Sequence, residues 1–145
     1  MYFCSVNRDG HPGWTSFSAS WNGIRFEKPN LLHIEAVTTM MDPFISPDEK
    51  YLLFVSGNDI FVSYKNDQDW SKAMKLPGSV NNGNANQSPA VSRDGKILYY
   101  SSARDSGFYK RNTEGKPLNY EELIKEMQSP FNGGFNILMI PVKLK

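Results

Sequence analysis

Short hydrophobic runs separated by polar turns fill most of the chain, and this pattern favours strands over helices. Residues 51–56 are apolar at both odd and even positions, so we expect a strand that is covered on both faces. Three more short strands are expected nearby, at residues 43–46, 59–64 and 70–76. Four short antiparallel strands within about 45 residues are typical of one blade of a β-propeller.

The same pattern returns further along the chain. The stretch DPFISPDEKYLLFVS at 42–56 matches SPAVSRDGKILYYSS at 88–102 at six of fifteen positions, where average composition gives about one. Residues 1–5 match the end of both copies. A repeat of this length predicts one domain built from stacked units. The three units lie at about 1–41, 42–87 and 88–145.

The third unit departs from this pattern through a helical insertion at about 103–135. Within it, residues 119–128 have the period of an amphipathic helix. Asn119 is a favoured N-cap residue, and Glu122 lies three positions later, which is the spacing of a capping box. A last strand is expected at 136–142. The side chains that share one face of the helix are Tyr120, Leu123 and Met127.

The two full copies differ at one turn position. In the Ser-Arg-Asp-Gly-Lys stretch at 92–96, Asp94 can hydrogen-bond the backbone that follows it, and Gly95 supplies a positive φ. Glu49 stands in place of that glycine in the Ser-Pro-Asp-Glu-Lys stretch at 46–50. The second unit is therefore expected either to use a turn with negative φ or to carry backbone strain.

Length and charge narrow the class of protein. The 145 residues fit one domain, and 39% hydrophobic residues are enough for a packed core. Sixteen basic and fifteen acidic residues leave a net charge of +1, so nucleic acid is not expected as a partner. No run approaches the ~18 apolar residues that cross a bilayer, so no membrane insertion is expected. Cys4 is the only cysteine, which excludes an intrachain disulfide.

Motifs for catalysis, metals and cofactors are not found. No Gly-x-Ser-x-Gly elbow and no Gly-rich phosphate loop occurs. The two histidines, His11 and His33, have no further histidine or carboxylate at metal-ligand spacing. We therefore expect no catalytic residue, no metal and no cofactor in this chain.

Several short motifs together resemble a known repeat family. They are Ser-Pro-Asp-x-Lys at 46–50, Asp-Ile-Phe-Val-Ser at 59–63, Trp70 after a polar turn, and Ser-Ser-x-Arg at 101–104. This combination resembles the WD-like repeats of TolB-type β-propellers, and in particular the C-terminal half of such a protein. The resemblance implies an all-β fold: a partial β-propeller of about two and a half four-stranded antiparallel blades, with one short helix inserted in the last blade.

The resemblance leads to further expectations. Propellers of this type usually have about six blades, so the chain is expected to be a fragment or one part of a larger assembly. Family members are typically periplasmic or secreted, although no signal peptide is recognised in this chain. A three-unit arc leaves apolar faces and strand edges open. A protein partner, the missing half of the propeller or a second copy is therefore expected to cover them.

Four residues are candidates for binding. Asp42 and Ser88 begin the innermost strand of their units, where they would face the central channel of a propeller. Arg104 closes the Ser-x-Arg corner, where its donor fork could meet a ligand carboxylate or bridge to the next blade. Tyr120 lies on the inserted helix.

These features predict a non-catalytic binding or scaffold module whose partner is a protein or a glycan. The alternative is a fragment of a propeller enzyme, a sugar hydrolase or lyase, whose catalytic residues lie mostly in missing blades.

Overall fold

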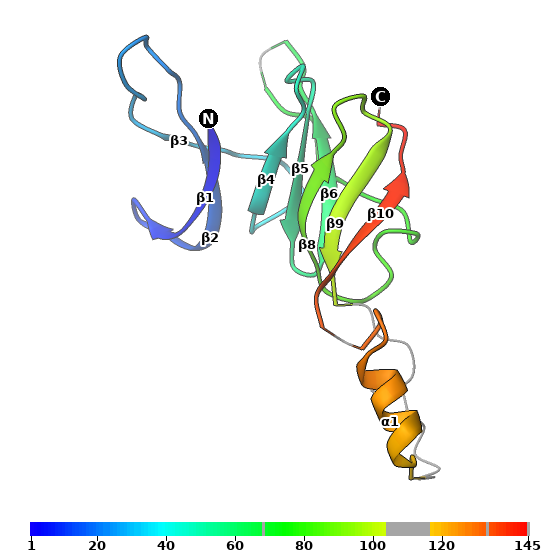
Figure 1. Cartoon of the computed structure of the whole chain (residues 1–145). Coiled ribbons are helices and arrows are strands. Elements are labelled where there is room, and N and C mark those ends of the chain that lie inside the picture. Colours follow the sequence, from blue (N-terminus) through cyan, green and yellow to red (C-terminus); the bar gives the residue numbers. More distant parts are fainter. Residues whose placement is uncertain (68, 104–116, 133, 145) are drawn as a thin grey trace.

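The fold is built from antiparallel strands. The computed structural model describes residues 1–67, 69–103, 117–132 and 134–144. These residues form three small antiparallel sheets and one short helix (Figure 1), so the all-β prediction is confirmed. Within the described ranges the sheets neither close nor curl into a propeller ring.

Each sheet follows one repeat unit and is a simple meander. The first sheet contains β1 (Tyr2–Arg8), β2 (His11–Ser18) and β3 (Asn30–Leu31). The second contains β4 (Met41–Ile45), β5 (Tyr51–Ser56), β6 (Asp59–Tyr64) and β7 (Met74–Lys75). The third contains β8 (Asn86–Val91), β9 (Ile97–Ser102) and β10 (Asn136–Pro141). The described residues therefore form a four-stranded unit only in the second sheet.

Strand bounds in the second sheet follow the hydrophobic pattern except at its outer edge. The strands β5 and β6 begin and end where they are predicted. The strand expected at 70–76 is wrong in extent, because only Met74–Lys75 pairs with β6. The hydroxyl oxygen of Ser71 accepts the backbone N–H of Tyr64 at 2.9 Å. This bond occupies a donor that a longer β7 would need for its ladder.

The hydrophobic core has two parts, one on each face of the second sheet. Along β5, Leu53 and Val55 pack toward the third sheet, where Leu98 is a partner. Leu52 and Phe54 point to the opposite face, since side chains alternate along a strand. These four side chains are fully buried, which explains why residues 52–55 are apolar on both faces of the strand. The residues that cover Leu52 and Phe54 include Tyr2, Leu32, Ile34 and Met40.

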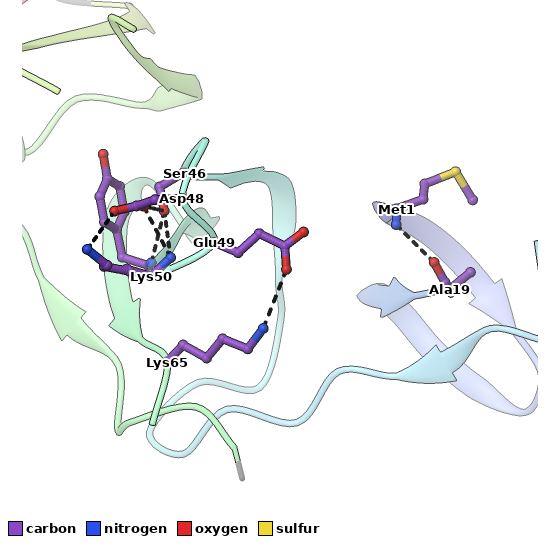
Figure 2. Close-up of polar contacts among 8 residues, drawn as sticks. Met1, Ala19, Ser46, Asp48, Glu49, Lys50 and Lys65 are labelled. Carbon is purple, nitrogen blue, oxygen red and sulfur yellow. Dashed lines mark hydrogen bonds and ion pairs between the residues drawn. The ribbon is translucent and has the colours of Figure 1, made fainter. Parts of the chain in front are cut away.

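The turn at Glu49 carries backbone strain, the second of the two expected alternatives. Glu49 has a φ of 53°, and Gly95 at the matching position has a φ of 74°. A side chain in this left-handed region is crowded by the following carbonyl, whereas glycine is not. The Glu49 carboxylate also lies 3.4 Å from the Lys65 ammonium (Figure 2), a surface ion pair of small energetic value.

Helix α1 (Tyr120–Met127) stands apart from the sheets. The Asn119 side chain accepts the Glu122 N–H at 2.9 Å, and the Glu122 carboxylate accepts the Asn119 N–H at 3.1 Å. The predicted capping box is therefore confirmed. None of the helical residues is buried, and the helix extends away from the sheets in Figure 1. In the described part of the chain, no helix is long and apolar enough to cross a membrane.

Candidate functional site

Two of the four candidate residues, Asp42 and Ser88, are in direct contact. The backbone N–H of Ser88 donates to Oδ2 of Asp42 at 2.9 Å, and the Ser88 hydroxyl oxygen lies 3.4 Å from the same atom. The two residues are 46 positions apart, so they occupy the same place in successive units. We call them the inner-edge pair, because β4 and β8 are edge strands of their sheets and contact each other.

Matching backbone irregularities place both residues. The pairing of β4 with β5 skips Asp42 and Pro43, and the pairing of β8 with β9 skips Ser88 and Pro89. Each strand therefore contains a β-bulge, where proline is tolerated because it has no N–H for the ladder. Asp42 and Ser88 have φ values of 49° and 50°. Strain of this kind persists only where the surrounding structure enforces it, and it clusters at functional sites.

The inner-edge pair presents polar groups to solvent. Ser88 is exposed and Asp42 is half-buried. Oδ2 of Asp42 is occupied by Ser88, whereas Oδ1 has no hydrogen-bond partner within the described residues. A carboxylate oxygen accepts hydrogen bonds from N–H, O–H or cationic groups. The arrangement can therefore hold a donor-rich ligand.

The other two candidates do not join this pair. Tyr120 lies in the first turn of α1, is strongly exposed, and extends with the helix away from the sheets (Figure 1). Arg104 lies outside the described residues, so its predicted role stays a prediction.

Two turns at the opposite end of β5 and β9 repeat one hydrogen-bond pattern. The Ser46 hydroxyl donates to Oδ1 of Asp48 at 2.8 Å (Figure 2), and the Ser92 hydroxyl donates to Oδ1 of Asp94 at 2.6 Å. These bonds are the main reason that the pKa of each aspartate carboxyl lies below its usual range. Both turns line a cavity of about 350 Å³, together with Arg93. Their hydrogen bonds close the turns, which indicates a structural role.

A cavity of about 260 Å³ in the first unit brings both histidines together. His11 comes from β2, His33 follows β3, and Thr38 comes from the next loop. Thr15 also lines the cavity, and its buried hydroxyl oxygen has no hydrogen-bond partner among the described residues. A neutral imidazole has one nitrogen that donates a hydrogen bond and one that accepts. The cavity therefore fits a small polar molecule.

The histidine cavity was missed by sequence reasoning because its two imidazoles come from separate segments outside the matched repeat. Only the pairing of β2 with β3 and the return of the following loop bring His11 and His33 to one place. No sequence signal links them. Across the residues that the structure describes, no group of three or more His, Cys, Asp or Glu side chains could hold a metal ion.

We compared the chain with known protein families, curated proteins and solved structures. No family model, no curated protein and no solved structure matches the chain at a significant level. Inference about function therefore starts from the inner-edge pair and from the repeat.

Proposed function

We propose that this chain is a TolB-like β-propeller segment that acts as a non-catalytic binding or scaffold module. Its contact surface centres on the inner-edge pair. The observation that carries this proposal is the 2.9 Å bond between repeat-equivalent residues on two neighbouring edge strands. In a propeller, the first strand of each blade lines the central channel, so the same residues would stand at the mouth of that channel.

The geometry of the pair supports recognition rather than structural support alone. Both residues adopt left-handed backbone conformations, which are uncommon for residues other than glycine, although Asp and Asn adopt them more readily than most. A purely structural bulge could use glycine at this position without strain. Retaining a carboxylate and a hydroxyl there keeps two polar side chains aimed at one exposed edge.

Oδ1 of Asp42, which accepts no hydrogen bond from the described residues, indicates the chemistry of the partner. An acceptor of this kind pairs best with a Lys or Arg side chain or with a backbone N–H, and also with sugar hydroxyls. We assign a protein segment with a basic residue as the partner. A glycan is the other outcome of the test.

Binding to immobilised peptide and oligosaccharide arrays tests this proposal. The substitution Asp42→Asn keeps an oxygen acceptor for Ser88 and suits a left-handed backbone, but it removes the charge. We expect it to abolish capture of basic peptides, while Asp67→Asn, at an exposed carboxylate in a distant turn, leaves capture unchanged. Equal capture by wild type and Asp42→Asn would overturn the proposal. Capture of oligosaccharides alone would replace the protein partner with a glycan.

A second candidate function is a sugar hydrolase or lyase, and the cavity shared by His11 and His33 favours it. Its test is the release of reducing ends from uronic-acid oligosaccharides by the purified chain. Loss of that release in His11→Asn and His33→Asn variants, with unchanged release in Asp42→Asn, would establish the enzyme. No release from any substrate would exclude it for this chain.

A further inference from the structure

The outer face of the third sheet exposes positions that are buried in the second sheet. Strand pairing aligns Leu53 and Val62 in the second sheet with Tyr99 and Met139 in the third. Leu53 and Val62 are 0% and 3% exposed, whereas Tyr99 and Met139 are 38% and 72% exposed. A third matched position is fully buried at Ile60 and 80% exposed at Ile137. We call Tyr99, Ile137 and Met139 the last-sheet face.

The repeat shows what covers such a face. In the second sheet the matching residues are covered by the neighbouring sheet of the next unit, which packs Leu98, Tyr100 and Leu138 against them. The covering element is thus another sheet of the same repeat, presented through its opposite face. Neighbouring apolar side chains that stay exposed on one face mark a site of interaction.

At the other end of the chain, the first sheet has an uncovered face that points away from the second sheet. Met1 and Phe3 of the first sheet match Leu52 and Phe54, which are buried against the preceding unit. Met1 is 52% exposed and Phe3 is half-buried. Phe3 stacks on Phe17, with the Arg8 guanidinium 5.4 Å from its ring centre. The charged groups at this surface lie beside it: the Arg8 guanidinium pairs with the Asp9 carboxylate at 3.2 Å, and the Met1 ammonium donates to the Ala19 carbonyl oxygen at 2.9 Å.

An aromatic contact within the chain shows how one unit packs on the next. Trp70 of the second unit packs edge-on against Tyr2 of the first, with ring centres 6.1 Å apart. Tyr2 has Tyr99 as its counterpart in the third unit. Trp70 has Phe26 as its counterpart in the first unit, because both residues close the same type of bridged turn. Phe26 is 47% exposed and contacts Trp21 of its own turn. We call Met1, Phe3 and Phe26 the first-sheet face.

We infer that two copies of this chain associate head to tail, with the first-sheet face of one copy covering the last-sheet face of the other. Phe26 of one copy packs against Tyr99 of its neighbour, as Trp70 packs against Tyr2 within the chain. The contact continues the stacking already present between the sheets, so it needs no new type of interface. It is heterologous, because different surfaces of the two copies meet. This inference does not depend on the inner-edge pair.

Molar mass from size-exclusion chromatography with light scattering tests the inference on the full chain. Wild type is expected to elute as a dimer or a larger species. Ile137→Lys with Met139→Lys, and separately Phe26→Lys, should raise the dissociation constant at least about tenfold and give monomers. Ile137 and Met139 are 80% and 72% exposed and Phe26 is 47% exposed. Because association itself raises the melting temperature, far-UV circular dichroism spectra that match wild type will show that both variants fold. Met127→Lys on α1 is the matched control and should keep the wild-type mass.

Mixing the two monomeric variants tests the head-to-tail geometry itself. Each variant keeps the face that the other has lost, so a one-to-one complex is expected on mixing. Two separate monomers in the mixture would overturn the inference, as would a monomeric wild type at the highest soluble concentration. Asp42→Asn should leave the mass unchanged, which separates this test from that of the binding surface.

Discussion

Oδ2 of Asp42 accepts a hydrogen bond from the backbone N–H of Ser88 at 2.9 Å, and the two residues hold the same position in successive repeat units. The bond joins the second sheet to the third along their edge strands. Because both residues sit in β-bulges before a proline, the same irregularity that strains the backbone also turns these groups toward each other. Residues at equivalent positions of the repeat therefore form a hydrogen bond between the second and third units.

The turns at Glu49 and Gly95 allow a matched pair of substitutions. Glu49→Gly relieves a left-handed conformation and should raise the free energy of unfolding by up to about 1 kcal/mol. Gly95→Glu introduces the same strain and should lower it by about 1–2 kcal/mol. A Cβ atom at Gly95 meets no neighbour within 4 Å, so the backbone alone decides the second effect. Urea unfolding measures both, and changes of equal sign would contradict the assignment of strain.

Acid should destabilise the fold through the two Ser-x-Asp turns. The pKa of Asp48 and of Asp94 is lowered in the folded chain, first by the Ser46 or Ser92 hydroxyl. A lowered pKa gives stability that is present above the unfolded value of about 4 and is lost as pH falls through the lower folded value. The double variant Asp48→Asn, Asp94→Asn should therefore show a flatter dependence of stability on pH below about 4. Unfolding curves that stay parallel with wild type in that range would refute this.

Asn81 should be among the most sensitive polar positions. Its buried side chain accepts the Ile60 N–H at 2.8 Å and donates to the carbonyl oxygens of Ile60 and Leu76 at 2.8 and 2.9 Å. Asn81→Ala removes all three bonds and leaves the Ile60 N–H and the Leu76 carbonyl oxygen without this partner, whereas the Ile60 carbonyl oxygen still accepts the Leu76 N–H at 3.0 Å. The substitution should cost about 2–4 kcal/mol. Gln87→Ala, at an exposed position of β8, is the control and should change stability by less than about 0.5 kcal/mol. Denaturant unfolding measures the loss of unfolding free energy in both variants. A loss in Asn81→Ala as small as that in Gln87→Ala would contradict the prediction.

Helix α1 should contribute little to the stability of the sheets. Tyr120 and Met127 are 77% and 55% exposed, so Tyr120→Ala and Met127→Ala should each change the free energy of unfolding by less than about 0.5 kcal/mol. Leu98→Ala, in the core between the second and third sheets, should cost about 2–5 kcal/mol in the same thermal melts. A large loss at Tyr120 would mean that the helix packs on the sheets after all.

Local patterns were sufficient to predict several elements. The bounds of β5 and β6 follow from a hydrophobic run between polar turns, and the Asn119 cap follows from a spacing of three residues. These features depend on neighbours in the chain, so they can be predicted without tertiary structure. The prediction of a strand over residues 70–76 was wrong in extent, because the Ser71 side chain competes for a backbone N–H that the strand ladder would use.

Long-range features could be predicted only in part. The repeat placed Asp42 and Ser88 in equivalent positions, but their bond depends on how two sheets stack. For Glu49, the pattern left two alternatives, because turn residues influence φ without determining it. The cavity of His11 and His33 had no sequence signal at all, since its walls come from segments joined only by pairing and loop return.

Amide hydrogen exchange at Ser88 tests most directly whether repeat-equivalent residues join the two units. In wild type the Ser88 N–H is held by the Asp42 carboxylate, and Asp42→Ala should speed its exchange about tenfold or more. The amide of Asn86, bonded to the Asn58 carbonyl oxygen at 3.1 Å, is the internal reference and should keep its rate, and Asp42→Asn should retain most of the protection at Ser88. Equal exchange of Ser88 in wild type and Asp42→Ala would contradict the link between the units.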